Sequence, residues 1–596
     1  MGKSTAKKNN TRINRLKPYL KKYGIGTVII LLATVVYFAP LLSRLDSYSE
    51  GGDSMFNSWT LARNHQCIMG NCNNYIDGNI YYPNKDTMLY SETQLSTGLL
   101  TLPLHFVNDN PIFSYNVWKI FSTFLSGWFM YLLVKKISKN HEVVSVLSGL
   151  IFAFAPFKMS ALGHLQNLSI FYLPLIILLV LSYLEHHKKR YLFGLLMSTI
   201  LLFYASWYQM FFVIGALGVF LLMVGILKLH SWKSIFIIGA VTVVAVISTI
   251  PLAKEYVRFS KANPEGTFTI GAQTSYSSSV ADYFIPHGGT LEGRLYDSVA
   301  PENARRTPYN MDSISYHGVS LYLLALTLLY LSFRQRKKSK EDSITYRWLV
   351  VWLAIGFVGL LFSLGPLLKV GGSYIYATLD SGVSLSVPLP YILLDFALPQ
   401  IQFIRAVGRW SVLLLFVLCV ALAYLPPVID KYPRLRVRKK LVYGVIIALF
   451  IFELAPLHHH YMSSRSHAYN IEIPEAYIYI KNSPEVDNLL VLYADQDYPN
   501  PELAFARMET VMWAGYHNKN IFNGYSGYTP PDYERVYADF QDLSADDAVK
   551  MTAYNLQYVL IDKYLSSTNP GLADTAKKLL KEVKYEDSRY LLLKIN

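Results

Sequence analysis

The sequence predicts an α-helical, multi-pass membrane protein with about eleven transmembrane helices and a small α/β domain at its C-terminal end. Of its 596 residues, 52% are hydrophobic and only 16% are charged, and the mean hydropathy is positive at +0.25. Soluble domains normally carry about 25% charged residues, so this deficit indicates a membrane. Apolar runs recur along the first three quarters of the chain, close to the roughly 20 residues that a helix needs to cross a bilayer.

These apolar runs define the predicted spans. In chain order they are Gly24–Leu42, Ile112–Val134, Val143–Leu162, Leu168–Leu184, Tyr191–Ser206, Tyr208–Leu227, Ser234–Pro251, Val319–Phe333, Leu349–Leu364, Ser411–Val428 and Leu441–Pro456. Ionisable residues are almost absent from their centres, since Lys119, Lys158 and Glu453 fall toward the outer ends. Ion-coupled transporters and pumps usually place such groups near the bilayer midplane, so the pattern disfavours that class.

Basic residues set the predicted orientation. The segment before the first span holds Lys7, Lys8, Arg12, Arg15, Lys17, Lys21 and Lys22, and every second loop after it is basic, at 135–139, 188–190, 228–233, 334–340 and 431–440. Cytoplasmic loops carry an excess of Lys and Arg, so this alternation predicts a cytoplasmic N-terminus and an extracytoplasmic C-terminal domain. The formal charge of +14 therefore reflects orientation in the cell membrane, and no basic stripe interleaved with aromatic residues indicates a nucleic-acid partner.

The alternation divides the chain into a transmembrane domain at 1–457 and a C-terminal domain at 458–596. The transmembrane domain has large outer loops at 43–111, 252–318 and 365–409, the last with an amphipathic stretch, Tyr391–Leu398, that suits a helix in the membrane interface. In the C-terminal domain, strands are expected at Asn488–Tyr493, Tyr558–Ile561 and Tyr590–Ile595, and helices at Pro474–Lys481, Pro531–Leu543 and Asp574–Val583.

Cys67 and Cys72 lie in the first outer loop, and Cys419 lies inside a span. An oxidising exterior would allow the first two to form a disulfide, and the sequence leaves open whether they do. His65 is nearby, but a fourth ligand for a zinc site is not evident.

The most concentrated polar motif follows the first span and reads Ser49-Glu50-Gly51-Gly52-Asp53-Ser54. Two glycines let the backbone turn sharply, so Asp53 can face back toward the membrane surface. A carboxylate held there could accept a proton from an acceptor hydroxyl during group transfer. The alternative is that Asp53 only caps a helix at Ser54–Arg63.

At this point the sequence resembles the GT-C class of integral-membrane glycosyltransferases, in which a long first outer loop carries an acidic residue soon after span one. Within that class it resembles the bacterial YfhO-like proteins. The matching motifs are Gly163-His164-Leu165-Gln166-Asn167, Asp282-Tyr283-Phe284-Ile285-Pro286, Ser363-Leu364-Gly365-Pro366, Phe403-Ile404-Arg405-Ala406-Val407-Gly408-Arg409-Trp410 and Asn523-Gly524-Tyr525-Ser526-Gly527-Tyr528.

The resemblance implies an inverting transferase that takes a sugar from a polyprenyl-phosphate carrier and passes it to a hydroxyl on a glycan, lipid or protein acceptor. The catalytic base would be Asp53, and Glu50, Asp77, Asp86 and Glu92 are less well placed for that role. Glu50, Gln166 and Asp282 are further candidate residues of the site. The chain lacks the Trp-Trp-Asp signature of oligosaccharyltransferases, so transfer of a whole oligosaccharide to Asn is disfavoured. No cofactor is expected, and no carboxylate cluster predicts an obligatory metal.

Three basic residues are candidates for binding the donor phosphate. Arg405 and Arg409 are four residues apart, so on a helix they would share one face and could grip a phosphate together. His164 could hydrogen-bond a carrier phosphate or an acceptor. The alternatives are that the arginines snorkel at the outer interface and that His164 is an ordinary interfacial residue.

Two other functions remain open at this point. One is a transporter of lipid-linked glycans or lipids, whose outer groove only passes a polyprenyl carrier. The other is a non-catalytic scaffold whose outer domain docks a partner in the cell envelope. A transporter should tolerate Asp53→Asn, and a scaffold should also tolerate loss of Arg405 and Arg409.

Overall fold

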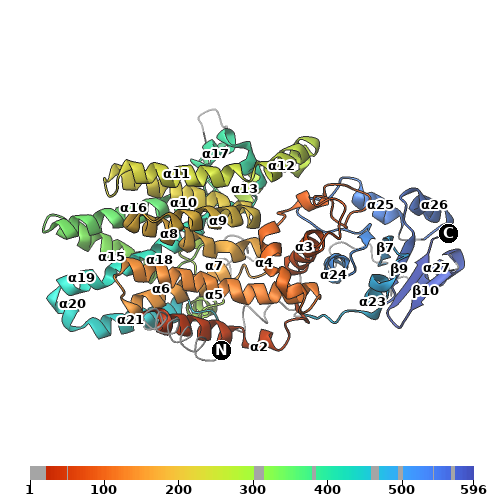
Figure 1. Ribbon diagram of the computed structural model, residues 1–596, viewed down its shortest axis with the longest axis horizontal. Helices are drawn as coiled ribbons and strands as arrows, with labels where there is room; N and C mark the ends of the chain where they lie inside the picture. Colours follow the sequence, from red (N-terminus) through yellow and green to blue (C-terminus); the bar gives the residue numbers. More distant parts are fainter. Residues whose placement is uncertain are drawn as a thin grey trace, which may run out of the picture.

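Long helices lie side by side along the long axis of the molecule, and a smaller domain with a β-sheet lies at one end (Figure 1). The computed structural model describes residues 22–49, 52–300, 314–378, 384–457, 469–493, 501–540, 543–565, 571–580 and 582–595. The bundle contains Lys22–Tyr37, α5 (Pro111–Ile137), α6 (Glu142–Phe154), α7 (Pro156–Met159), α8 (Tyr172–His186), α9 (Lys189–Ala205), α10 (Trp207–Ile226), α11 (Trp232–Ile247), α15 (Val319–Gln335), α16 (Lys340–Ser363), α18 (Val412–Ala421), α19 (Leu425–Lys431), α20 (Pro433–Val437) and α21 (Lys439–Glu453).

Every apolar run identified in the sequence coincides with helix in the structure. Among the described residues, six helical segments are long and apolar enough to cross a membrane. The pair α11 and α12 (Ile250–Ala262), bent by 53°, would make a seventh. The helix Lys22–Tyr37 and α15 are shorter apolar helices. The multi-pass helical fold is therefore confirmed, and the count of eleven spans stays a prediction.

The predicted outer loops fold into short helices and strands. The first loop contains α2 (Ala39–Leu42), β1 (Tyr48–Ser49), α3 (Asp53–Ile68), η1 (Thr87–Tyr90) and α4 (Leu95–His105); η2 (Leu165–Phe171) precedes α8. The second contains α12, η3 (Pro264–Gly266), α13 (Ile270–Ser275), η4 (Val280–Tyr283) and α14 (Leu291–Val299). The third contains β2 (Lys369–Val370), β3 (Ser373–Tyr374), β4 (Tyr376–Thr378), β5 (Ser384–Ser386), α17 (Tyr391–Ala397) and η7 (Pro399–Phe403), followed by η8 (Val407–Ser411); η9 (Leu422–Tyr424) links α18 to α19.

The C-terminal domain is built on a five-stranded sheet in the order β10-β11-β9-β7-β8. Its elements are α23 (Glu475–Asn482), β7 (Asn488–Leu492), α24 (Pro501–His517), β8 (Asn520–Ile521), α25 (Tyr533–Asp539), α26 (Ala545–Ala553), β9 (Tyr558–Asp562), α27 (Leu572–Leu580), β10 (Glu582–Glu586) and β11 (Tyr590–Lys594). Strand β7 runs parallel to β8 and β9, whereas β11 runs antiparallel to β9 and β10. All described residues of β7 and β9 are buried, as expected for strands covered on both faces.

The three predicted strands and three predicted helices of this domain are all present. The sequence does not predict β6 (Tyr469–Asn470), β8, β10, α24 or α26. The predicted helix Asp574–Val583 is too long at its C-terminal end, since α27 ends at Leu580 and β10 begins at Glu582. The predicted boundary at residue 458 falls in 458–468, outside the described residues.

Helices α3 and α24 join the first outer loop to the C-terminal domain. A Cβ added to Gly515 of α24 would lie 2.9 Å from the Ala62 side chain and 3.2 Å from the Trp59 backbone, so the close approach of the two helices requires a glycine there. Strand β1 also pairs antiparallel with β6 (Tyr469–Asn470), which leads into the domain. The two sequence-predicted domains therefore share a packed interface.

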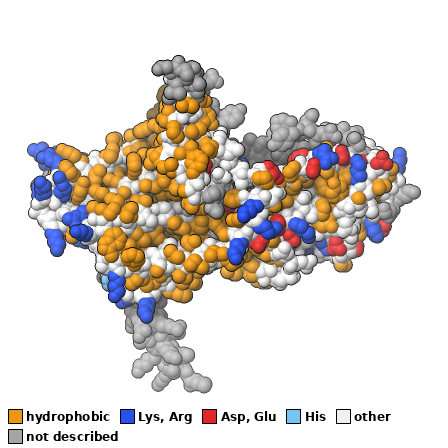
Figure 2. Space-filling view, turned by 90° about the horizontal axis from the view of Figure 1, so that it is seen from above, with side chains coloured by type: hydrophobic (Ala, Val, Ile, Leu, Met, Phe, Trp, Pro, Cys, Tyr) orange, Lys and Arg blue, Asp and Glu red, His pale blue; other side chains and the backbone are white. Residues whose placement is uncertain are grey.

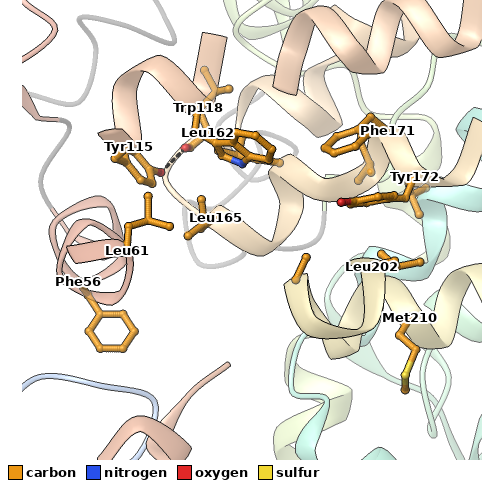
Figure 3. Packing of buried hydrophobic residues seen from close by; sticks show 14 of the residues in the cluster. Phe56, Leu61, Tyr115, Trp118, Leu162, Leu165, Phe171, Tyr172, Leu202 and Met210 are labelled. Carbon is orange, nitrogen blue, oxygen red and sulfur yellow. Dashed lines mark hydrogen bonds between the residues drawn. The ribbon is translucent and has the colours of Figure 1, made fainter. Parts of the chain in front are cut away.

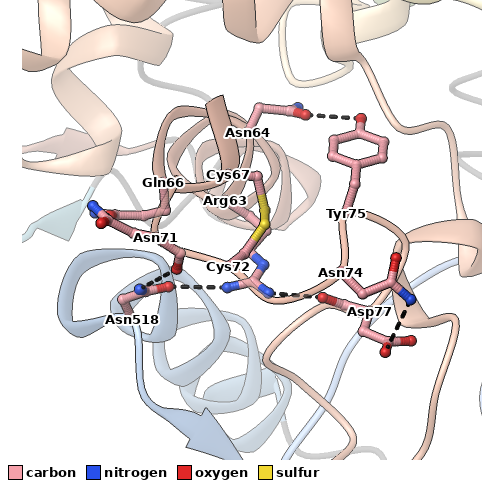
Figure 4. Close-up of a disulfide and its surroundings, with 10 residues drawn as sticks. All are labelled: Arg63, Asn64, Gln66, Cys67, Asn71, Cys72, Asn74, Tyr75, Asp77 and Asn518. Atoms are coloured by element: carbon pink, nitrogen blue, oxygen red, sulfur yellow. Dashed lines mark hydrogen bonds between the residues drawn. A yellow bond between two sulfur atoms is a disulfide. The ribbon is translucent and has the colours of Figure 1, made fainter. Parts of the chain in front are cut away.

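The far end of α3 is tied to the same domain (Figure 4). The Arg63 guanidinium donates to the Asn518 side chain at 3.0 Å and to the Asp77 carbonyl at 2.7 Å. A disulfide links Cys67, in the last turn of α3, to Cys72, which settles the question that the sequence left open. Helix α3 is thus held at its C-terminal end by covalent and charge-assisted contacts.

Contacts between side chains bring the basic loops together at the end of the bundle opposite the C-terminal domain. Lys136 pairs with Glu185, Lys139 with Glu341, and Lys431 with Asp342. Lys and Arg gather at this end, an apolar surface covers the middle, and charges of both signs cover the C-terminal domain (Figure 2). Lys and Arg are therefore segregated to one end of the bundle, as the alternation of basic loops in the sequence predicts. Residues 1–21 of the basic tail lie outside the described residues, and which end is cytoplasmic stays a prediction.

Labelling of single introduced cysteines tests this orientation. We expect a membrane-impermeant thiol reagent to label a cysteine near Asp574 in intact cells, and to label one near Lys338 only after the cells are opened. Background should be low because Cys67 and Cys72 are in a disulfide and Cys419 is buried. Labelling near Lys338 in intact cells would show that the orientation is inverted.

Candidate functional site

Asp53 is the first residue of α3 and lines a cavity at the end of the bundle next to the C-terminal domain. The helix starts sharply because Gly52, at its N-cap, has φ of +59°, a conformation that favours glycine. The sequence alternative, in which Asp53 is the capping residue, is not what the structure shows, since Gly52 holds that position. The carboxylate lies in the first turn, where the helix dipole favours negative charge.

Both oxygens of the Asp53 carboxylate have protein contacts. His164 Nε2 lies 3.0 Å from Asp53 Oδ2, and the Tyr525 hydroxyl donates a hydrogen bond to Oδ1 at 2.8 Å. The side chain of Asp53 is 38% exposed and that of His164 is 17% exposed. The carboxylate is thus oriented by two partners from distant parts of the chain while part of it stays open to the cavity.

The loop that carries His164 is fixed from several sides. Tyr115 of α5 donates to the Leu162 carbonyl at 2.6 Å, within the apolar packing around this loop (Figure 3). Asn57 of α3 donates to the Gly163 carbonyl at 3.1 Å. The buried Lys158 ammonium contacts the Leu168 carbonyl at 3.3 Å. These contacts set the position of His164 relative to Asp53.

Tyr525 lies in the segment 523–528 of the C-terminal domain, which brings its side chain to Asp53. The Tyr81 backbone donates to the Asn523 carbonyl at 2.9 Å, and the Gly524 N–H donates to the Tyr533 hydroxyl at 3.1 Å. A Cβ on Gly524 would lie 2.3 Å from the Tyr81 ring, so only glycine fits there. The Tyr525 ring packs edge-on against Phe56 at 6.0 Å.

The cavity has a volume of about 760 Å³. Its walls come from the first outer loop, the start of α10, the bend between α11 and α12, the segment 403–409 and the segment 525–528. Of the residues singled out in the sequence, Asp53, His164, Gln166, Arg405 and Arg409 line it.

Asp282 does not join this group. It is not among the cavity's lining residues, and its carboxylate accepts a hydrogen bond from the Ser279 N–H in a capping box of η4. Glu50 lies outside the described residues.

Arg405 and Arg409 share the cavity, but not through one helical face. Arg405 precedes η8 in non-helical backbone, so the helix-face argument from their spacing is wrong. The Tyr208 hydroxyl accepts from the Arg405 N–H at 2.9 Å and holds that backbone in place. The Arg405 guanidinium lies 4.5 Å from the Tyr276 ring, and that of Arg409 lies 5.2 Å from the Tyr208 ring. The two cations therefore reach the cavity from a chain bend braced by aromatic rings.

Glu92, considered less well placed than Asp53 from the sequence, also lines the cavity. Its Oε1 accepts from the Ser206 hydroxyl and from the N–H groups of Trp207 and Tyr208, at 3.1, 2.6 and 3.2 Å, and so satisfies the N-terminus of α10. Burial raises the pKa of Glu92 to about 7, although these bonds and the charge of Arg409 oppose the shift. Glu92 thus changes charge near neutral pH.

Within the described ranges, no group of three or more His, Cys, Asp or Glu side chains is placed to hold a metal ion. The independence from a metal stays a prediction.

Comparison with solved structures identifies the fold. The mycobacterial arabinofuranosyltransferase AftD is similar over 97% of this chain and 40% of its own, with a TM-score of 0.54 and 11% identity. An oligosaccharyltransferase from Archaeoglobus fulgidus, in the apo form, is similar over 93% of this chain and 71% of its own, with a TM-score of 0.49 and 11% identity. ArnT from Cupriavidus metallidurans, bound to undecaprenyl phosphate, is similar over 96% of this chain and 98% of its own, with a TM-score of 0.38 and 11% identity. The fold is that of the GT-C class.

Comparison with curated proteins found none that matches this chain. The finer resemblance to YfhO-like proteins stays a prediction. A protein-family model described as "Domain of unknown function (DUF6311)" matches residues 78–452. That match covers more than half of the sequence and includes every cavity wall except the start of α3 and the segment from the C-terminal domain. The chain therefore belongs to the DUF6311 family.

Proposed function

We propose that this protein is an inverting membrane glycosyltransferase that moves a sugar from a polyprenyl-phosphate carrier to a hydroxyl acceptor on the extracytoplasmic side. The observation that carries the proposal is the oriented, partly exposed Asp53 carboxylate in a cavity that also contains Arg405 and Arg409. The GT-C fold supports the class of reaction, since AftD, which is similar over 97% of this chain, is an arabinofuranosyltransferase. Because fold alone does not determine activity, the argument depends on the site.

The chemistry assigned to Asp53 is general base catalysis. The acceptor hydroxyl oxygen forms a bond to the anomeric carbon of the donor sugar, and its proton passes to the Asp53 carboxylate. On the opposite face of that carbon, the bond to the phosphate oxygen breaks, and its electron pair leaves with the carrier phosphate. The products are the glycosylated acceptor and polyprenyl phosphate, with inverted configuration at the sugar.

The walls of the cavity suit a donor with both an anionic and an apolar part. Side chains of α10 and of the bend between α11 and α12 make one wall apolar, including Phe211, Ile214 and Ile250. Arg405 and Arg409 place two cations beside that wall. A lipid chain would pack on the apolar wall, and its phosphate would take charge-assisted hydrogen bonds from the arginines.

The proposal is tested with purified protein and a panel of polyprenyl-phosphate sugars. We expect at least one donor to release polyprenyl phosphate, and we expect Asp53→Asn to slow that release by roughly 10²–10⁴. Donor passage across a proteoliposome membrane that is equal in wild type and Asp53→Asn, without release of polyprenyl phosphate, would identify a transporter. Absence of both activities in a folded protein would favour the scaffold.

A further inference from the structure

The structure places a protein hydroxyl on the carboxylate that the reaction would use. Tyr525 donates to Asp53 Oδ1 at 2.8 Å, within the range in which a general base contacts the hydroxyl that it deprotonates. We propose that the Tyr525 hydroxyl occupies the position of the acceptor hydroxyl and keeps water out of it until an acceptor displaces it. Tyr525 is then a specificity-determining residue, and this inference rests on the proposed function of Asp53.

The position of Tyr525 is imposed from both sides. Its ring packs edge-on against Phe56, which lies one turn after Asp53 on α3, and Gly524 leaves no space beside the Tyr81 ring. The other carboxylate oxygen faces His164, so Oδ1 is the oxygen that Tyr525 covers. Packing between α3 and the C-terminal domain therefore fixes the Tyr525 hydroxyl on this oxygen.

Tyr525 can hold the position without reacting. Burial, together with the neighbouring Asp53 charge, raises the pKa of Tyr525 far above its ordinary value. The phenol therefore keeps its proton and remains a hydrogen-bond donor to the carboxylate. A sugar hydroxyl that replaces it can donate the same hydrogen bond, so displacement by a hydroxyl acceptor leaves the Asp53 carboxylate hydrogen-bonded.

Water can occupy the same position beside Asp53. When water replaces the acceptor hydroxyl there, the donor is hydrolysed. In that side reaction the water oxygen bonds to the anomeric carbon and its proton passes to Asp53. The bond from carbon to phosphate oxygen breaks, and free sugar and polyprenyl phosphate are released. Because the cavity adjoins Asp53, removing the Tyr525 hydroxyl leaves space that cavity water can enter.

The test is Tyr525→Phe, which keeps the ring against Phe56 and removes only the hydroxyl. With the polyprenyl-phosphate sugar that wild type turns over, and with no acceptor added, we expect this variant to release free sugar about threefold to tenfold faster than wild type. Tyr81→Phe is the matched control, since Tyr81 is a neighbouring buried tyrosine whose hydroxyl faces Thr529 at 3.4 Å. Its hydrolysis rate should equal that of wild type.

The outcomes separate this inference from the proposed function. Faster hydrolysis in Tyr525→Phe that disappears in the double variant with Asp53→Asn supports it. Equal or slower hydrolysis in a Tyr525→Phe variant with wild-type thermal stability overturns it, because a structural or directly catalytic tyrosine would give that result. If wild type and Asp53→Asn both fail to release polyprenyl phosphate from any donor, the proposed function fails first and the inference fails with it.

Discussion

Asp53→Asn should lower turnover by roughly 10²–10⁴ while the protein still folds and binds its donor. A sugar hydroxyl is a poor nucleophile at neutral pH, so attack on the donor needs a base within hydrogen-bond reach. Asparagine keeps the size of the side chain and can still accept from the Tyr525 hydroxyl, which contacts Oδ1 at 2.8 Å. It cannot accept a proton. The measurement is release of polyprenyl phosphate under saturating donor, with donor affinity measured separately.

Asp77→Asn provides the control for this experiment. Asp77 lies in the same outer loop and accepts hydrogen bonds from the Asp86 N–H at 2.9 Å and from Asn74 at 3.2 Å, but it does not line the cavity. Its turnover should stay close to that of wild type. Near-normal turnover in a well-folded Asp53→Asn variant would remove Asp53 from the role of base, and Glu50 would become the next candidate.

Arg405→Ala should weaken donor binding by roughly tenfold or more. If the guanidinium binds the carrier phosphate, the substitution removes a charge-assisted contact of about 1.5–3 kcal/mol. We expect this loss to appear in the apparent affinity for the donor, with little change in turnover at saturating donor. Arg258→Ala is the control, because Arg258 is an exposed cation on α12 that pairs with Asp86 and does not line the cavity. Unchanged donor affinity in both Arg405→Ala and Arg409→Ala would assign these arginines to interfacial anchoring.

The contribution of Arg409 to donor binding should depend on pH, because the charge of the nearby Glu92 carboxyl changes with pH. Burial raises the pKa of Glu92 to about 7, so the carboxyl is mostly neutral at pH 6 and mostly charged at pH 8. The proposed donor, a polyprenyl-phosphate sugar, is a phosphodiester and would keep one negative charge across this range. Charging Glu92 near Arg409 should therefore weaken donor binding about threefold between pH 6 and pH 8. Glu92→Gln, which keeps the acceptor for the α10 N-terminus, should remove this pH dependence.

The helical fold was predictable because bilayer thickness imposes a strong pattern on sequence. Runs such as Ile112–Val134 and Ser411–Val428 can satisfy their backbone in lipid only as helices, and both are helical in the structure. The short edge strand β8 and helix α24 carry no comparable periodic signal. Their formation depends on packing against α3 and on backbone hydrogen bonds to residues 79–82 of the first outer loop.

The sequence indicated several residues of the site, but it did not indicate which of them contact one another. The glycine before Asp53 and the position just after span one indicated the acidic residue, and the outer-face arginines indicated a cationic wall. The pairing of Asp53 with Tyr525 joins residues 472 positions apart, and no local pattern encodes such a contact. The sequence does not indicate that His164 contacts Asp53, because the fold of the loop sets the distance between them. A role for His164 toward a phosphate or an acceptor stays a prediction.

The hydrogen bond between Asp53 and Tyr525 has a consequence for biosynthesis. The ribosome adds about 5–20 residues per second, so Tyr525 is made roughly 20 to 100 seconds after Asp53. During that interval the spans insert in order, and α3 has neither α24 nor the segment 523–528 to pack against. A nascent chain in the membrane thus carries an unfinished site, and an interrupted translation product that ends before residue 525 would leave its carboxylate uncovered.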